Sequence, residues 1–421
     1  MVSSVVVVGA GFAGLNAAKT LANRSNVRVT LIDHRNHHLF QPLLYQVATA
    51  GLSPADIAVP IRVQFRDAPN VEIRLGRVDA VDLDQQTVLA DGHRLAYDHV
   101  ILACGARHSY FGHPEWEEFA PGLKTLEQAT EIRRRMLVAF ERAESERDPE
   151  TQTAYLTFVV VGGGPTGVEL AGAIADISRT AMTGDFRRIR PESAHIVLVE
   201  AAPRVLTTFS EEISERARRD LAQLGVEVRT NAKVDGIDGD GVTIAGRKLR
   251  AKTVLWAAGV EAEQIHITPA LETDRARRIK VTNDFSVSGR PNVFVVGDMA
   301  SFETGPGTLL PGVAPAAIQG GIHAAQMILS DLSGDPRKPF KYNDRGSLAT
   351  IGKSRAVAQI GRVTLTGHIA WLTWLLVHVY SLIGFRNRMA VLFEWAWSYI
   401  FSRRDARLIT EREWRLRQSR D

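Results

Sequence analysis

Two glycine-rich turns of matching spacing are the features of this sequence with the clearest chemical meaning. Each follows a run of valines, at residues 5–8 and 159–161, and each opens an alanine- and leucine-rich stretch that predicts a helix. In this spacing the first glycine makes a tight turn, the second lets backbone approach a pyrophosphate, and the third lets the helix pack against the strand. Unpaired N–H groups at the helix start then bind phosphate oxygens. The glycines are Gly9, Gly11 and Gly14 in the first turn and Gly162, Gly164 and Gly167 in the second.

An acidic residue ends the strand that follows each turn. Asp33 comes at about the 20-residue distance typical of dinucleotide sites, whereas Glu200 lies farther on, so Thr183 to Ser193 must form a loop or a helix extension. Such an acid can accept both hydroxyls of an adenosine ribose and repels a 2′-phosphate, which favours NADH over NADPH. Arg204 leaves that preference open. Glu200 could instead be a helix cap or a surface acid, and both turns could be purely structural.

The order of strands and helices predicts an α/β fold with two doubly wound, Rossmann-like units. Continuous apolar strands that alternate with helices are typical of a buried parallel sheet. After the second unit, Pro291 to Val296 form one more apolar strand, which ends in Gly297 and Asp298. We expect this strand to return to the first unit, so that the second unit is inserted into it. The expected domains are 1–115 with 275–345, then 116–274, and a C-terminal region 346–421.

The composition excludes several classes of chemistry. The chain has 421 residues, 45% of them hydrophobic, and a formal charge of +4, which suits anionic cofactors or an anionic membrane surface. The single cysteine, Cys104, excludes a cysteine redox pair and a zinc knuckle. His34, His37 and His38 lack a metal-binding spacing, so we expect no metal, and nothing points to nucleic acid. No secretory signal precedes the first strand, which favours a cytoplasmic location.

In combination these motifs resemble the type II NADH dehydrogenases, which are single-chain, membrane-associated NADH:quinone oxidoreductases. The resemblance covers nearly the whole chain and includes both glycine turns with their flanking residues. It continues in the segments H-L-F-Q-P-L-L-Y-Q-V-A at 38–48 and N-V-F-V-V-G-D-M-A at 292–300, in Pro311 to Gly321, and in the tryptophan-rich end.

The resemblance implies that FAD binds in the first unit and NADH in the second. Hydride would pass from NADH to the flavin, and two electrons from the flavin to a membrane quinone, without proton pumping. The residues implied for FAD are Gly9, Gly11, Gly14, Asp33 and Asp298, and those for NADH are Gly162, Gly164, Gly167 and Glu200. Further predicted cofactor contacts are Phe12, Ala13, Gln46, Val78, Gly105, Thr166 and Gly259.

The resemblance also indicates three residues for catalysis. Glu169 would lie near the nicotinamide and the flavin, where it could relay protons to a reduced quinone; it could equally be an acid that stabilises the first turn of a helix. Gln319 matches the second glutamine of a family segment where quinone approaches, but Pro315 replaces the first and removes an amide. Lys353 matches a family lysine near the flavin, or is a surface lysine in a turn.

The C-terminal region predicts two short apolar helices. Ile369 to Phe385 carry no Asp, Glu, Lys or Arg, and a helix of this length, about 25 Å, is short for a membrane span. Met389 to Phe401 are shorter still. Tryptophans and flanking arginines favour docking at the membrane surface; a dimer interface or a lid over the core is the alternative. The residues that recur on one face of the first helix are Trp371, Trp374, Leu375, His378 and Leu382, and the nearby arginines and last tryptophan are Arg386, Arg388, Arg403, Arg404, Arg407 and Trp414.

The most favoured hypothesis is therefore a peripheral, monotopic NADH:quinone oxidoreductase on the cytoplasmic face of the membrane, with a homodimer left open. A soluble ferredoxin or rubredoxin reductase of the same fold is one alternative. A membrane-docked flavin redox sensor is the other.

Overall fold

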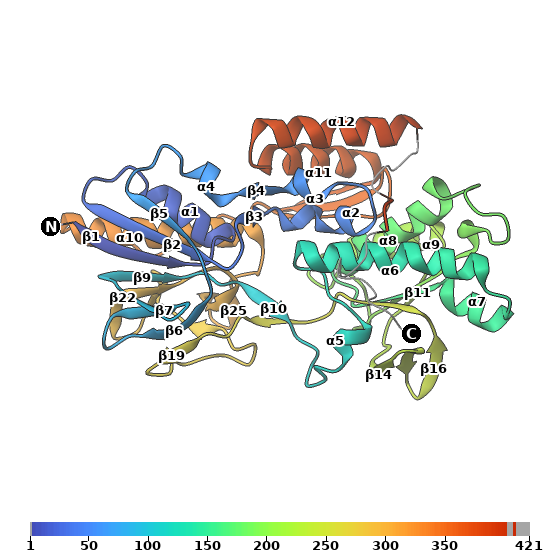
Figure 1. Ribbon diagram of the computed structural model, residues 1–421, viewed down its shortest axis with the longest axis horizontal. Helices are drawn as coiled ribbons and strands as arrows, with labels where there is room; N and C mark the ends of the chain where they lie inside the picture. Colours follow the sequence, from blue (N-terminus) through green and yellow to red (C-terminus); the bar gives the residue numbers. More distant parts are fainter. Residues whose placement is uncertain (1, 402–406, 410–421) are drawn as a thin grey trace, which may run out of the picture. The chain divides into compact units, whose positions relative to one another are not determined.

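The computed structural model describes residues 2–401 and 407–409, which divide into two compact units (Figure 1). The first unit comprises the residues up to 39, residues 58–107 and residues 260–345. The second unit comprises residues 40–57, 108–259 and the chain from 346 onward. The chain passes between the units near the short strands β10 (Ala106–His108) and β18 (Val260–Ala262).

A six-stranded sheet is the centre of the first unit. Its strands pair in parallel, except that the edge strand β21 runs antiparallel to β22. The strand order is β21 (Ser286–Val287), β22 (Arg290–Val295), β9 (His99–Leu102), β1 (Ser3–Val8), β2 (Val27–Asp33) and β5 (Val71–Leu75). The return of β22 to this sheet agrees with the strand expected at 291–296. Val5 to Val8 of β1 are all buried, so side chains on both faces of the sheet are covered and these residues are apolar without alternation.

Two helices of the first unit, α1 (Phe12–Leu21) and α10 (Ala314–Ser333), pack closely against each other beside this sheet (Figure 1). Small residues permit the approach, since an added Cβ at Gly321 would lie 2.1 Å from the carbonyl oxygen of Ala13. The remaining elements of this unit are β3 (His37–Leu39), β4 (Ala58–Pro60), α4 (Ile61–Gln64), β6 (Val78–Asp82), β7 (Thr87–Ala90), β8 (His93–Ala96), β19 (His266–Thr268), β20 (Ile279–Lys280), η4 (Gly297–Met299), β23 (Ala300–Ser301), β24 (Glu303–Gly305) and β25 (Thr308–Leu309).

The second unit repeats the strand–turn–helix pattern of the first. Its parallel sheet has the order β13 (Val226–Arg229), β12 (His195–Val199), β11 (Thr157–Val161) and β17 (Thr253–Trp256). Beside it lies an antiparallel sheet of β14 (Val234–Asp238), β15 (Gly241–Ile244) and β16 (Arg247–Arg250). The helices are α5 (Trp116–Phe119), α6 (Leu126–Ser145), α7 (Pro149–Tyr155), α8 (Pro165–Asp176) and α9 (Glu211–Gln223). A π-helical turn, Ile177–Ala181, and the 3-10 turn η3 (Pro191–Ser193) account for the long stretch before β12.

Residues 40–57 and the C-terminal segment also belong to the second unit. In Figure 1 the two C-terminal helices, α11 and α12, lie alongside each other next to α2 and α3. These elements are η1 (Gln41–Leu43), α2 (Leu44–Ala48), α3 (Pro54–Ile57), β26 (Ser347–Thr350), β27 (Ala356–Ile360), β28 (Val363–Thr366), α11 (Gly367–Ser381) and α12 (Phe385–Phe401). Segments more than 300 residues apart in the sequence are therefore neighbours here, as a hydrogen bond between Tyr45 and Thr350 shows.

The tight packing of α1 against α10 yields a stability prediction. We expect Gly321→Ala to destabilise the protein by about 1–3 kcal/mol, because its methyl group would force backbone apart rather than a flexible side chain. Gly305→Ala is the matched control, since an added Cβ there meets nothing within 4 Å. Urea unfolding of the two variants measures the difference in the free energy of unfolding. Equal unfolding midpoints would show that α1 and α10 can move apart to admit the methyl group without cost.

Candidate functional site

The two glycine turns have nearly the same backbone geometry. Gly9 has φ +98° and Gly162 has φ +110°, a region that residues with a side chain rarely adopt. An added Cβ at Gly9 would lie 2.4 Å from the carbonyl oxygen of Ala103, and one at Gly162 would lie 2.7 Å from the carbonyl oxygen of Ala257. Both turns therefore require glycine at their first position.

The second and third glycines of each turn have opposite surroundings. An added Cβ at Gly14 would lie 1.8 Å from the carbonyl oxygen of Gly9, and one at Gly167 would lie 1.8 Å from the carbonyl oxygen of Gly162. At Gly11 and Gly164 an added Cβ meets nothing within 4 Å, and neither residue caps its helix with a side chain. Each turn thus leaves open space where a pyrophosphate can reach the N–H groups of the helix start, which fits a dinucleotide.

Asp33 and Glu200 hold their turns in the same way. The N–H of Ala10 donates to Asp33 Oδ2 at 2.6 Å, and the N–H of Gly163 donates to Glu200 Oε2 at 2.5 Å. The second carboxylate oxygen of each acid accepts an N–H from its own loop, from Arg35 at 2.8 Å and Ala202 at 2.7 Å. The two acids therefore order the turn as well as offering oxygens that can bind ribose hydroxyls.

The crossover strands also end alike in the two units. Strand β9 leads to Gly105, with φ +76°, and β17 leads to Gly259, with φ +69°. An added Cβ at Gly259 would lie 2.5 Å from the ring of Phe111, whereas at Gly105 it meets nothing within 4 Å. Burial raises the pKa of the neighbouring Cys104 thiol to about 12, so this cysteine stays protonated and unreactive.

Asp298 lies where three elements of the first unit meet. It belongs to η4, which follows β22 and packs against α10. An added Cβ at Gly297 would contact Ala13 at 3.3 Å, and one at Gly312 would lie 3.4 Å from Asp298 Oδ1. The structure thus brings Asp298 beside the start of α1, next to the first glycine turn.

The other predicted cofactor contacts lie in different surroundings. Phe12 packs edge-on against the His38 ring at 5.1 Å, and His38 Nδ1 lies 2.9 Å from the carbonyl oxygen of Ala10, so this histidine braces the first turn. Val78 is a buried residue of β6, and Thr166 is exposed in the first turn of α8. Sequence reasoning missed the role of His38.

Glu169 is a partly buried acid of α8 that accepts a hydrogen bond from β26. The backbone N–H of Thr350 donates to its Oε1 at 3.4 Å. Burial raises the pKa of the Glu169 carboxyl to about 8, against a smaller lowering by this N–H. A carboxyl with this pKa is partly protonated near neutral pH and can give or take a proton.

Lys353 and Gln319, the other predicted catalytic residues, lie in different units. Lys353 lies in the turn after β26, and this turn packs on α8, because an added Cβ at Gly172 would lie 2.6 Å from the backbone nitrogen of Gly352. In the first unit, Gln319 Nε2 donates to the carbonyl oxygen of Asn343 at 3.0 Å, and the N–H of Asn343 donates to Gln319 Oε1 at 3.0 Å. The Gln319 amide is therefore engaged with backbone at both ends.

Pro315 occupies the first turn of α10. A proline in this position costs the helix no hydrogen bond, because the first N–H groups of a helix have no partner within it. The substitution that removes the family glutamine is thus compatible with an intact helix.

Comparisons with known proteins agree with this geometry. The pyridine nucleotide-disulphide oxidoreductase family matches residues 3–321, and the NDH2 C-terminal domain matches residues 345–404. The type II NADH:quinone oxidoreductase Ndh of Mycobacterium tuberculosis is 44% identical, over 97% of this chain and 90% of that protein. NdhA of the same organism, also a type II NADH:quinone oxidoreductase, is 45% identical over 96% and 89%.

The chain belongs to the type II NADH:quinone oxidoreductases. A solved structure of NDH2 from Plasmodium falciparum in complex with NADH has the same fold, with a TM-score of 0.88 over 98% of this chain and all of that one, at 19% identity. The family, the α/β fold class and the enzyme class predicted from the sequence are confirmed.

The C-terminal helices of this oxidoreductase expose an apolar face. Trp374 is almost fully buried and stacks on the His378 ring at 4.3 Å, so the face predicted from the tryptophans points inward. The opposite side of α11 is exposed, and exposed apolar residues of α12 extend this surface. We call this surface the apolar face; its residues are Ile369, Leu372, Leu376, Tyr380, Met389, Phe393 and Trp397.

Among the residues described, no helix combines the length and apolar character that crossing a membrane needs. Three features expected from the sequence, Arg403, Arg404 and Trp414, lie outside these residues. Arg407 is described, and it donates to the carbonyl oxygen of Ala181 at 2.8 Å and pairs with Asp185.

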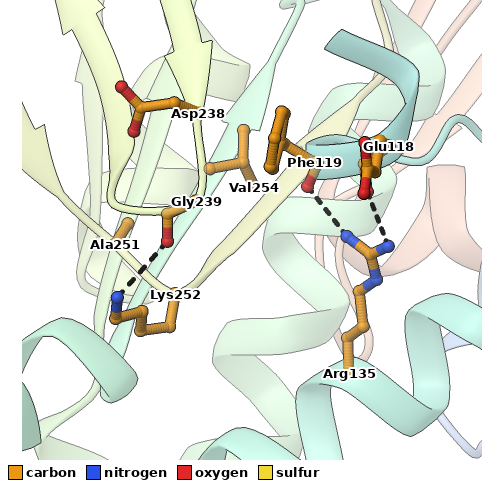
Figure 2. Close-up of a pocket in the computed structure, with 8 residues that line it drawn as sticks. All are labelled: Glu118, Phe119, Arg135, Asp238, Gly239, Ala251, Lys252 and Val254. Atoms are coloured by element: carbon orange, nitrogen blue, oxygen red, sulfur yellow. Dashed lines mark hydrogen bonds between the residues drawn. The ribbon is translucent and has the colours of Figure 1, made fainter. Parts of the chain in front are cut away.

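Figure 2 shows a shallow hollow of about 200 Å³ in the second unit. Its polar groups largely bind one another: Arg135 donates to the carbonyl oxygens of Glu118 and Phe119, and Lys252 donates to that of Gly239. None of the predicted site residues lines it. The hollow therefore belongs to the bracing of α5, α6 and the small antiparallel sheet.

The pKa of Glu169 makes stability depend on pH. Between the usual pKa of 4.5 and the folded value of about 8, the folded protein holds a proton that the unfolded chain releases, so stability falls as pH rises through this window. We expect Glu169→Gln to melt at the same temperature as the unmodified protein near pH 5 and about 2 °C higher above pH 8. Thermal unfolding across pH measures this, with the exposed Glu192→Gln as control. A constant difference at all pH values would mean that the Glu169 carboxyl titrates normally.

Proposed function

We propose that this chain is a peripheral enzyme of the membrane surface in which Glu169 supplies protons to a quinone. The family assignment makes it an FAD-dependent oxidoreductase that oxidises NADH and reduces quinone. The observation that carries the proposal is a carboxyl with a raised pKa in the same unit as an apolar pair of helices. When bound, FAD accepts hydride from NADH and passes two electrons to the quinone.

The residues of each turn are proposed to hold one dinucleotide. The open positions at Gly11 and Gly164 let pyrophosphate approach the starts of α1 and α8, and Asp33 and Glu200 bind the riboses. Asp298, beside the first turn, suits a hydroxyl-rich part of FAD, because hydroxyl groups can donate hydrogen bonds to its carboxylate. Phe12, Ala13, Gln46, Val78, Gly105, Thr166 and Gly259 stay predicted contacts.

The surroundings of Glu200 favour NADH over NADPH. The positive charge of Arg204 could have offset the negative charge of Glu200 and so could have favoured a 2′-phosphate. The Arg204 guanidinium donates to the carbonyl oxygens of Phe209 at 2.8 Å and Thr207 at 3.0 Å within its own loop. It is thus engaged in ordering that loop, while the Glu200 carboxylate repels an added phosphate.

Reduction of a quinone to a quinol needs two protons as well as two electrons, and the Glu169 carboxyl can pass on one proton at a time and regain it from solvent. Its protonated form is favoured by burial, and Thr350 orients one of its oxygens. Lys353 lies in the turn packed on the same helix and is proposed to take part in the same step. Gln319, in the first unit, stays a predicted catalytic residue.

Replacing Glu169 tests this role. We expect Glu169→Gln to slow quinone reduction about 100-fold, the size of a general-acid contribution, while NADH still reduces the flavin at the original rate. In the unmodified enzyme quinone reduction should fall as pH rises through about 8, because the proton-bearing form is lost, and Glu169→Gln should lose this pH dependence. Stopped-flow absorbance separates the two half-reactions, with Glu192→Gln as control. Fast quinone reduction by Glu169→Gln would contradict the proposal.

The apolar face is proposed to lie on an anionic lipid surface. Leu376 and Phe393 are 67% and 65% exposed, and the exposed Arg386 lies in the first turn of α12. An apolar helix face with adjacent arginines binds interfaces that carry negative headgroups. Because such lipids dominate the cytoplasmic leaflet, we propose a monotopic enzyme on the cytoplasmic face, anchored by the region from 346 onward.

Two glutamates on the apolar face should release the enzyme from lipid. We expect Leu376→Glu with Phe393→Glu to reduce cosedimentation with phosphatidylglycerol vesicles more than tenfold, because a charged side chain resists burial among acyl chains. Val63→Glu, which changes an exposed apolar residue of the first unit, should bind as before. If vesicle binding persists and sedimentation shows that a dimer dissociates instead, the face is a homodimer interface and the membrane proposal is wrong.

A further inference from the structure

A line of hydrogen bonds runs through the second unit from the last helix to Thr350. Trp395 Nε1, on α12, donates to Gln46 Oε1 at 2.7 Å, and Gln46 Nε2 donates to Tyr45 Oη at 3.0 Å. Tyr45 Oη lies 2.9 Å from Thr350 Oγ1 on β26. Because the indole can only donate, the Gln46 amide has one orientation, in which its nitrogen donates to the Tyr45 hydroxyl. Either hydroxyl can be the donor in the bond between Tyr45 and Thr350.

Thr350 connects this line to the acid on α8. Its side chain contacts Tyr45, and its backbone N–H donates to Glu169 Oε1. One residue of β26 is thus held by Tyr45 and in turn holds Glu169. Four segments that are remote in the sequence, on α12, α2, β26 and α8, meet along this line.

The middle of the line is shielded from water. Tyr45 is 7% exposed, Thr350 is 2% exposed, and Trp395 packs against the buried Trp374 at a ring distance of 5.2 Å. Water cannot readily replace a bond that breaks here, so the loss of one partner leaves a buried polar group unpaired. The line is therefore a stiff connection between α12 and Thr350.

We propose that Trp395, Gln46 and Tyr45 are positioning residues, which hold Glu169 through Thr350 so that quinone reduction depends on the placement of α12. This inference rests on the proton-supplying role proposed for Glu169. It gives the Gln46 amide a definite function, since both of its ends are used within this line. The alternative is a brace that only stabilises the packing of α12.

Conservative variants separate the two interpretations. Tyr45→Phe and Trp395→Phe each remove one hydrogen bond and keep an aromatic ring, and Thr350→Val removes the Tyr45 bond from its other end. Tyr110→Phe is the matched control: its hydroxyl donates to the carbonyl oxygen of Ala120 at 2.9 Å, and Tyr110 is also 7% exposed. Stopped-flow absorbance gives flavin reduction by NADH and flavin reoxidation by a soluble quinone for each purified full-length variant.

We expect the three variants in the line to reoxidise about fivefold more slowly, the effect of one lost hydrogen bond, with flavin reduction changed less than twofold. The control should change neither step. In the Glu169→Gln background, Tyr45→Phe should cause no further slowing, because the line acts through the carboxyl. A further fivefold loss in that background, equal slowing of both half-reactions, or unchanged rates in all three variants would overturn the inference.

A spectroscopic measurement tests the line without turnover. The indole N–H resonance of Trp395, identified by its loss in Trp395→Phe, should shift in Tyr45→Phe and Thr350→Val but not in Tyr110→Phe. An unmoved resonance would show that the bonds are independent and would overturn the inference. Failure of the proposed function looks different: Glu169→Gln itself would reduce quinone at the original rate, whereas failure of the inference alone leaves Glu169→Gln slow and Tyr45→Phe fast.

Discussion

The fold depends on two approaches of backbone to backbone that glycine alone permits. The third glycine of each turn sits against the carbonyl oxygen of the first, so the helix start cannot move away from the strand end. The acid at the end of the next strand then binds the turn through the N–H of Ala10 or Gly163. Each turn is thereby ordered before a dinucleotide arrives, and less conformational entropy is lost on binding.

This arrangement resolves an ambiguity that the sequence left open. Asp33 and Glu200 could be structural acids or acids that bind ribose, and the structure gives each a structural role. The two roles do not compete, because a carboxylate offers several lone-pair positions and these bonds from backbone N–H groups use only part of them. An acid fixed by two N–H groups is also a rigid acceptor. The same hydrogen bonds that hold the turn therefore aim the carboxylate.

The sequence predicts what local pattern encodes and misses what distant packing creates. The glycine spacing, the valine runs and the terminal acids predict both units, because strand, turn and helix are consecutive. The bond between Tyr45 and Thr350 joins residues 305 positions apart, and no periodicity records it. The exposed face of α11 was not predictable for another reason: the helix is apolar on most sides, so Trp374 marks the inner face only once α12 is placed against it.

Glu169 shows why a site can conflict with stability. Burial keeps a proton on its carboxyl, and the N–H of Thr350 opposes this only weakly at 3.4 Å. A nearby cation would bind the carboxylate more strongly and would lower its pKa, which would make the acid a better structural partner and a poorer proton donor. Because burial outweighs the weak backbone contact, the pKa of the carboxyl stays near neutral pH, where it can give or take a proton. Under the role proposed for Glu169, the line from Trp395 to Thr350 matters because it fixes a backbone N–H that contacts this carboxyl.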